Sequence, residues 1–150
     1  MQVQMNKAMA GLLEAAEARK APIPSKLADL LSRGFVEHEG CYFLAGLYPH
    51  RGSAWTDLFP DATGYEAFIN HLHLDDFTDG DDQLSVGLSY LDRQLDLWKK
   101  SQFAAIPISA IVSYDGDSCV VRFHALRTGE RWLCNDLEHY EKDAVLVACL

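Results

Sequence analysis

The residue types best suited to chemistry lie together in the segment His71-Leu72-His73-Leu74-Asp75-Asp76. Imidazole nitrogens and carboxylate oxygens are the ligands that zinc and related metals take in catalytic sites. The ligands of such a metal would be His71, His73 and either Asp75 or Asp76. The segment therefore suggests one candidate function, a small metal-dependent enzyme.

The spacing of these residues restricts that hypothesis. On an α-helix, His71 and His73 would point about 200° apart and could not share one ion, whereas on an extended segment they could. The pattern resembles the start of the metal motif of metallo-β-lactamase-like hydrolases, His-x-His-x-Asp-His, but Asp76 stands where that family has His. That family also needs further ligands downstream and a longer chain. We expect surface or capping histidines, assign no catalytic residue, metal or cofactor, and keep the enzyme as the alternative.

Charge is the second chemical signal. The 41 residues from Gly52 to Asp92 contain nine Asp and Glu and no Lys or Arg, while the rest of the chain is neutral. The whole net charge of −9 therefore lies in this acidic window. Concentrated like charges destabilise a folded protein, so packing alone does not require them. A cationic partner, either a basic protein surface or a metal ion, is the simplest reason to keep them.

The loop from Asp75 to Asp82 is the densest part of the window, with five Asp in eight residues. Calcium prefers such oxygen ligands, but the EF-hand pattern is not met, since Phe77 stands at position 3 and Val86 at position 12. A solvated loop that caps the following helix is one interpretation, and a surface for a basic protein is the one we favour. The predicted partner-binding residues are Asp75, Asp76, Asp79, Asp81, Asp82, Asp57, Asp61, Trp55 and Phe59.

Aromatic residues accompany the charges. Trp55 and Phe59 belong to a predicted loop over residues 48–60, beside the acidic window. Aromatic anchors surrounded by charge are typical of interface hot spots, although packing under a long loop is the alternative for both. A separate polar group is expected on the sheet, because alternation places Arg122 and His124 on one face of their strand, with Ser109 and Ser113 on the neighbouring strand. That face would meet water, bind an anion or carry acid–base work.

Composition excludes several partners. A chain of 150 residues without a linker is expected to form one domain, residues 1–150. Its acidity and lack of basic runs argue against nucleic acid and against anionic membranes. No apolar run approaches the roughly 20 residues of a membrane span, and the N-terminus is not a signal peptide. Four scattered Cys without a Cys-x-x-Cys pair suggest buried free thiols and a reducing cytoplasm.

Hydrophobic periodicity predicts the elements that position these residues. Helices are expected over residues 5–20, 25–32, 63–74 and from 83 to about 102, the last with apolar residues spaced 4, 3, 4 and 3. Strands are expected over residues 35–38, 41–47, 106–114, 118–126, 131–134 and 143–150. Helices followed by an antiparallel meander indicate an α+β fold. The N-terminal helices and a central helical pair would pack on one face of a mainly antiparallel C-terminal sheet.

In size, charge layout and α+β make-up, the chain resembles the small acidic immunity proteins of bacterial contact-dependent inhibition and other polymorphic toxin systems. This resemblance is one of general character and rests on no motif. It implies a cytoplasmic binding protein that blocks a cognate toxin domain, usually a nuclease. A nuclease site is basic because it holds phosphate, so closely spaced carboxylates could occupy it. A regulatory or scaffold module that dimerises through an apolar face is a third hypothesis, and the oligomeric state is not predicted.

Overall fold

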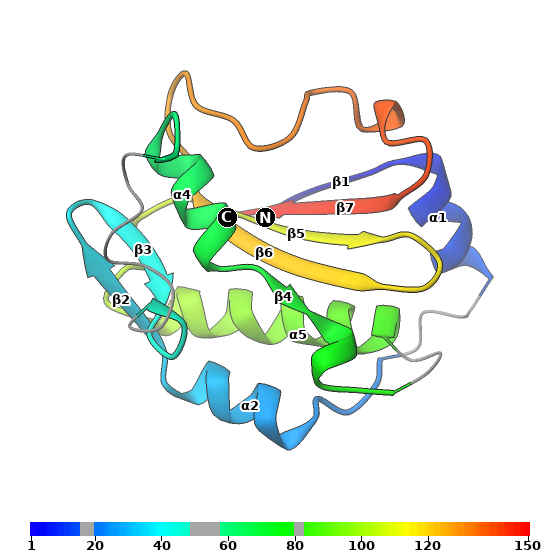
Figure 1. Ribbon diagram of the computed structural model, residues 1–150, viewed down its shortest axis with the longest axis horizontal. Helices are drawn as coiled ribbons and strands as arrows, with labels where there is room; N and C mark the ends of the chain where they lie inside the picture. Colours follow the sequence, from blue (N-terminus) through cyan, green and yellow to red (C-terminus); the bar gives the residue numbers. More distant parts are fainter. Residues whose placement is uncertain (16–19, 49–57, 80–82) are drawn as a thin grey trace.

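The computed structural model describes residues 1–15, 20–48, 58–79 and 83–150. These residues form an α+β fold in which four α-helices pack against a five-stranded antiparallel sheet, with a two-stranded hairpin beside it (Figure 1). The predicted fold class is therefore confirmed. The helices are α1 (Lys7–Glu14), α2 (Ser25–Ser32), α4 (Ala62–Ile69) and α5 (Gln83–Lys100). The sheet strands, in spatial order, are β1 (Gln2–Met5), β7 (Ala144–Cys149), β5 (Ile108–Tyr114), β6 (Cys119–Ala125) and β4 (Leu72–His73).

Helix α5 lies along one face of the sheet, as its apolar periodicity predicts. Trp98 is fully buried and Leu84, Leu91 and Leu95 are nearly so, while Leu88 packs at the margin of the core. The helix comes close to the strands at Gly87, where an added Cβ would lie 2.8 Å from the Cys119 Sγ. The odd-numbered residues of β6 therefore face α5, and α2 lies on the far side of α5 from the sheet (Figure 1).

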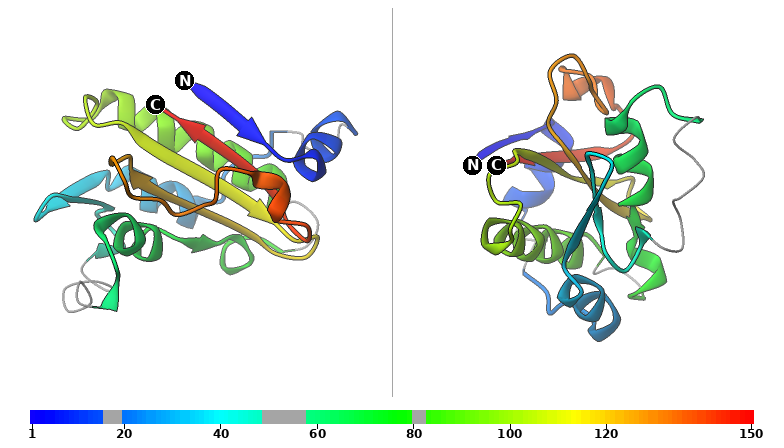
Figure 2. Two further views of the ribbon diagram at one scale, coloured as in Figure 1. Left: turned by 90° about the horizontal axis from the view of Figure 1, so that it is seen from above. Right: turned by 90° about the vertical axis from the view of Figure 1, so that its left-hand side faces the viewer.

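The opposite face of the sheet is covered by residues 126–143, called here the strap (Figure 2). Ile111, Leu137 and Val145 form a small second core beneath it, against which Leu133 and Tyr140 pack. The predicted strand over residues 131–134 is wrong, since that part of the strap forms no ladder. Two contacts hold this part of the strap across the face of the sheet. The Arg122 Cζ lies 4.9 Å from the centre of the Trp132 ring, and Leu133 packs against the second core.

The N-terminal prediction also needs correction. Instead of one helix over residues 5–20, the chain first forms β1, which pairs with β7 through the register Gln2↔Cys149 to Met5↔Leu146. Asn6 separates strand from helix, because its side chain accepts the Met9 N–H at 3.0 Å and thereby caps α1. Asn6 therefore marks the boundary between β1 and α1. The strand before it is only four residues long, which is too short for its alternation to be recognised in the sequence.

Helix α4 is shorter than predicted. Asp61, rather than Thr63, is the N-cap residue and accepts the Gly64 N–H at 2.7 Å. The helix ends at Ile69, and Asn70 caps it before the chain extends into β4. The rest of the predicted helix is β4 followed by the 3₁₀ turn η2 (Leu74–Asp76).

Side chains and β4 together close the outer edge of β6. Gln83 accepts the Cys119 N–H at 2.9 Å, and Leu72 of β4 pairs with Val121. Farther along, the Asn70 amide donates to Phe123 O at 3.3 Å. Glu66 accepts the Ala125 N–H at 2.6 Å. An open sheet edge is a template for association, so these four contacts protect β6.

The hairpin consists of β2 (Phe35–His38) and β3 (Cys41–Leu44), joined by Glu39 and Gly40 as predicted. Both turn residues have positive φ, 51° at Glu39 and 78° at Gly40, which suits the twist of a two-residue hairpin turn. A second predicted hairpin, β5–β6, is also present, with its turn at residues 115–118. Among the described residues no helix has the length and apolar character that crossing a membrane requires.

The four cysteines are free thiols, and the expectation that all are buried is partly wrong. Cys41 and Cys119 are buried in the core, whereas Cys134 is exposed on the strap and Cys149 is half-buried at the end of β7.

Candidate functional site

A row of rings leads from α4 to the acidic turn η2. Phe59 lies 5.2 Å from Phe68, Phe68 lies 5.5 Å from His71, and His71 lies 5.2 Å from His73, measured between ring centroids. The Phe68 side chain is 41% exposed, although the helical period predicts it inside. We name this surface the aromatic–acidic strip and define it as Phe59, Phe68, His71, His73, Asp75, Asp76 and Asp79.

Local structure explains why these side chains face outward. Strand β4 buries Leu72 against the sheet and leaves the flanking His73 exposed, as period-two alternation requires. Leu74 is then fully buried and anchors η2, so that Asp75 and Asp76 project into solvent. Apolar anchors thus alternate with exposed polar groups along the strip.

The carboxylates of the strip have no counter-charge among the described residues. Asp75, Asp76 and Asp79 are exposed, and none of the ion pairs within residues 1–15, 20–48, 58–79 and 83–150 involves them. The other predicted residues divide into two groups. Asp61 is half-buried and caps α4, and Phe59 is half-buried between Tyr65 and Phe68. Asp57, Asp81, Asp82 and Trp55 lie outside the described residues.

Two acidic residues of the window are neutralised by basic residues from elsewhere in the chain. Glu66 is fully buried and pairs with Arg127 of the strap, and Asp92 lies 2.9 Å from the Lys20 Nζ. The hydrogen bond that Lys20 donates to Asp92 raises the pKa of Lys20 above its usual value. The expectation that the whole acidic window lacks counter-charge is therefore wrong for these two residues. The unpaired carboxylates occupy a smaller part of the window than the sequence suggests.

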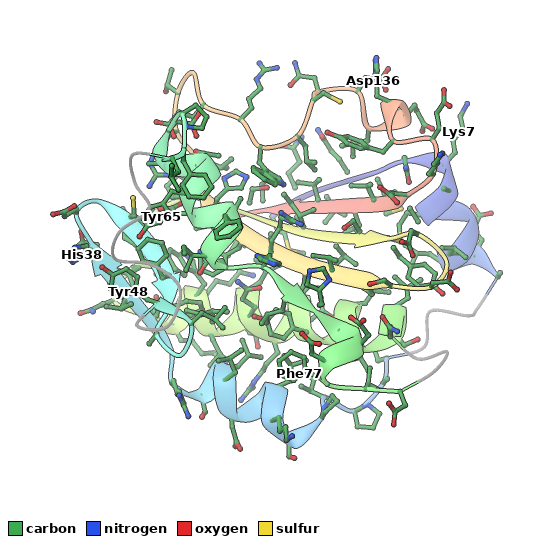
Figure 3. All side chains as sticks on the ribbon, viewed as in Figure 1. Lys7, His38, Tyr48, Tyr65, Phe77 and Asp136 are labelled. Carbon is green, nitrogen blue, oxygen red and sulfur yellow. The ribbon has the colours of Figure 1, made fainter. Side chains whose placement is uncertain are left out.

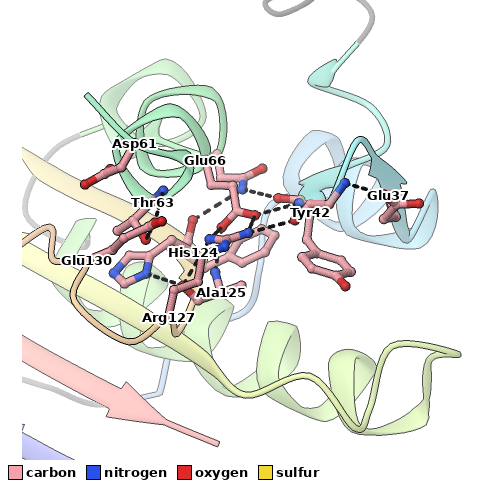
Figure 4. Close-up of polar contacts among 12 residues, drawn as sticks. Glu37, Tyr42, Asp61, Thr63, Glu66, His124, Ala125, Arg127 and Glu130 are labelled. Carbon is pink, nitrogen blue, oxygen red and sulfur yellow. Dashed lines mark hydrogen bonds and ion pairs between the residues drawn. The ribbon is translucent and has the colours of Figure 1, made fainter. Parts of the chain in front are cut away.

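The Glu66 carboxylate joins three parts of the fold (Figure 4). It accepts backbone N–H groups from Tyr42 of β3 at 2.7 Å and from Ala125 of β6 at 2.6 Å, besides its two bonds to Arg127. Arg127 donates in addition to Gly40 O at 2.9 Å. Sequence reasoning missed this network because the partners lie far apart along the chain. The only signal was one charged residue inside the apolar run Tyr65 to Ile69.

Within the described part of the chain, His71 and His73 do not form a metal site with acidic partners. His71 and His73 lie on an extended segment, so their rings are near each other, and His71 Nδ1 donates to Phe68 O. However, the described residues contain no group of three or more His, Cys, Asp or Glu placed to hold a metal ion. The calcium-loop hypothesis involves residues 80–82 and so falls partly outside the described residues.

The polar sheet face predicted from alternation forms the floor of a cavity of about 290 Å³ under the strap. Ser109 and His124 are opposite each other in the β5–β6 ladder and are 4% and 6% exposed, so this face is not solvated as one alternative supposed. Burial lowers the pKa of His124. Arg122 and Ser113 share the face but line a neighbouring hollow. Within the described chain no hydrogen bond joins Ser109 to His124, so no nucleophile–base pair is formed.

Comparison with known proteins identifies the family. A family profile matches residues 4–149, almost the whole chain. The chain belongs to the Uncharacterized protein PM0498 family. It is similar to the Uncharacterized protein PM0498 of Pasteurella multocida (strain Pm70), with 29% identity over 75% of each chain. No solved structure matches. The name of the PM0498 family states no activity, so function must be argued from the residues themselves.

Proposed function

We propose that this protein is a binding protein that neutralises a basic protein partner through the aromatic–acidic strip. The observation that carries the proposal is the set of exposed carboxylates on Asp75, Asp76 and Asp79, which have no ion-pair partner among the described residues. Elsewhere the fold does supply counter-charge to the acidic window, at Glu66 and Asp92. A partner with Lys or Arg side chains on its surface would supply the counter-charge that these three carboxylates lack.

The neighbouring apolar groups support a protein partner over a small cation. Phe68 is 41% exposed and Leu58, next to Phe59, is 66% exposed. Interfaces commonly combine an aromatic anchor with a charged rim, in which the anchor supplies affinity and the charges speed encounter. The strip contains both parts within one stretch of chain that runs from Phe59 to Asp79.

The kind of partner follows from the charge. Closely spaced carboxylates imitate the phosphates of a nucleic acid, so they fit a site that evolved to hold phosphate. We therefore propose an immunity protein that acts in the cytoplasm and blocks a cognate, nuclease-type toxin domain. It would act by occupying the basic site and would itself catalyse nothing.

The test measures affinity for a basic, nuclease-type toxin domain, which is to be sought as the C-terminal part of a large secreted protein encoded directly upstream. Isothermal titration would compare the wild type with Asp75→Lys/Asp76→Lys/Asp79→Lys. A matched control reverses three exposed carboxylates elsewhere, Glu14→Lys/Asp29→Lys/Glu141→Lys, and so changes net charge equally. We expect the first variant to lose at least about tenfold in affinity, with a weaker dependence on salt, and the control to lose much less. Equal losses in both variants would show that only net charge matters and would remove the strip's role.

The metal-dependent enzyme is the competing function, since His71 and His73 lie close together. Elemental analysis of protein purified without added metal separates the two. A stoichiometric transition metal that is lost in His71→Ala/His73→Ala would favour the enzyme and count against the binding protein.

A further inference from the structure

The cavity under the strap has a polar floor whose hydrogen-bonding groups the protein leaves partly unused. Ser109 is 4% exposed and lines the cavity, and no hydrogen bond joins its hydroxyl to another described residue. A hydroxyl that faces a cavity without a protein partner can bond to a molecule that enters it. The Ser109 hydroxyl is therefore available to a ligand inside the cavity.

His124 defines what that molecule must offer. Its Nδ1 donates to Ala125 O at 2.9 Å, which fixes the proton on Nδ1 when the ring is neutral. Burial lowers the pKa of the ring and keeps it neutral at physiological pH. The other nitrogen, Nε2, therefore presents a lone pair and accepts a hydrogen bond. A ligand must donate to His124, while the neighbouring Ser109 hydroxyl can donate to the ligand.

The size of the cavity and the residues of its walls further restrict the class of ligand that it can hold. A cavity of about 150 Å³ holds a benzene ring, so 290 Å³ is enough for a two-ring molecule. Trp132 and Leu126 line it and are 38% and 40% exposed, which gives an apolar mouth above the polar floor. Glu130 and Arg131 both lie in the lining, so its formal charges balance and a neutral ligand suits it. Apolar walls with few convergent polar groups are typical of small-molecule sites.

We propose that the cavity binds a neutral, planar heterocycle with adjacent N–H and C=O groups, that is, a cyclic amide. The N–H donates to His124 Nε2, the C=O accepts from the Ser109 hydroxyl, and the rings lie against Trp132. This site is on the opposite face of the sheet from α5 and shares no residue with the aromatic–acidic strip, so the two can be tested independently.

The experiment uses 2-quinolinone, a two-ring cyclic amide, as the probe and N-methyl-2-quinolinone as its matched control without the N–H donor. Binding to the full chain is followed by titration calorimetry and by ¹H–¹⁵N spectra, with the His124 ring nitrogens observed directly. We expect saturable binding with shifts confined to the cavity lining and to the His124 Nε2. The methylated probe should bind at least about tenfold more weakly, because it leaves the buried Nε2 without a donor.

Two serine variants test the floor. Ser109→Ala removes the hydroxyl from the cavity and should weaken binding several-fold, whereas Ser113→Ala, on the same face of β5 but outside the cavity lining, should not. Equal binding of the two probes to the wild type would overturn the proposal, as would equal affinity of the two serine variants. Absence of binding at the solubility limit of the probe would do the same and would leave water as the partner of Ser109. The probe comparison needs only the wild type, so it stands even if Ser109→Ala folds poorly.

Discussion

Glu66 and Arg127 form a bidentate ion pair, in which Arg127 Nη2 lies 2.6 Å from Glu66 Oε1 and Nη1 lies 3.0 Å from Oε2. Glu66 is fully buried, whereas the Arg127 side chain is 21% exposed. The hydrogen bond to Glu66 raises the pKa of Arg127 above its usual value. Because the same carboxylate also receives two backbone N–H groups, α4, β3, β6 and the strap all depend on one side chain.

Removal of this carboxylate is expected to be severely destabilising. Glu66→Ala would leave a partly buried guanidinium and two backbone donors without their acceptor, at a cost of about 3–5 kcal/mol in the free energy of unfolding. Urea unfolding of the wild type and the variant measures the loss. Glu141→Gln, an exposed carboxylate with no described ion pair, serves as control and should stay within about 0.5 kcal/mol of the wild type. A comparable effect in the two variants would mean that the network contributes little.

Two glycines should respond oppositely to the same substitution. At Gly11 in α1, a Cβ would meet no atom within 4 Å, so Gly11→Ala should stabilise the protein by about 0.5–1 kcal/mol through helix propensity. At Gly87 in α5, the Cβ would lie 2.8 Å from Cys119 Sγ, and Gly87→Ala should destabilise by about 1–3 kcal/mol despite the same propensity. Thermal unfolding compares them. The added Cys119→Ala should recover part of the loss at Gly87, and a lack of recovery would place the clash elsewhere.

The elements with a clear hydrophobic period could be predicted from the sequence, whereas contacts between residues far apart in the chain could not. The apolar spacing from Leu84 to Trp98 correctly identified α5, and alternation in residues 119–125 correctly assigned the two faces of β6. Glu66 could not be placed, because its partner is 61 residues away and no local pattern links them. The strand predicted over residues 131–134 is a short apolar run after Arg131, and these residues pack on a face of the sheet instead of joining its ladder. Exposed Asp75, Asp76 and Asp79 followed from charge alone, and their role as partner-binding residues stays a prediction.

Acid should weaken the fold partly through His124. Burial lowers the pKa of His124 in the folded protein below its ordinary value of 6.5, so the unfolded chain binds more protons in the interval between the two values. Stability therefore rises with pH across that interval and is complete above about pH 6.5. Urea midpoints between pH 7.5 and 5.5 should fall on acidification. The fall should be smaller in His124→Gln, and an identical slope would contradict the assignment.

The four thiols should differ in reactivity in the native state. Burial raises the pKa of Cys41 to about 11 and that of Cys119 to about 12, so almost no thiolate forms at pH 8. Cys134 is exposed on the strap and should react first with a disulfide reagent, followed by the half-buried Cys149. A timed titration, with and without denaturant, measures the groups that react. Cys134→Ser should abolish the fast phase, and a fast phase that persists would show that another thiol is accessible.

The attachment of the β2–β3 hairpin has a dynamic consequence. The hairpin is a separate two-stranded sheet. Glu66 accepts the Tyr42 N–H, and Asn70 accepts the Leu44 N–H and donates to Tyr42 O. Arg127 of the strap donates to Gly40 O. Segments held in this way can open as a cooperative unit while the remaining sheet stays intact. Amide hydrogens of residues 35–44 would then exchange together, once these side-chain bonds break and Phe43 and Leu44 leave the core, and faster than those of β5 at the centre of the sheet.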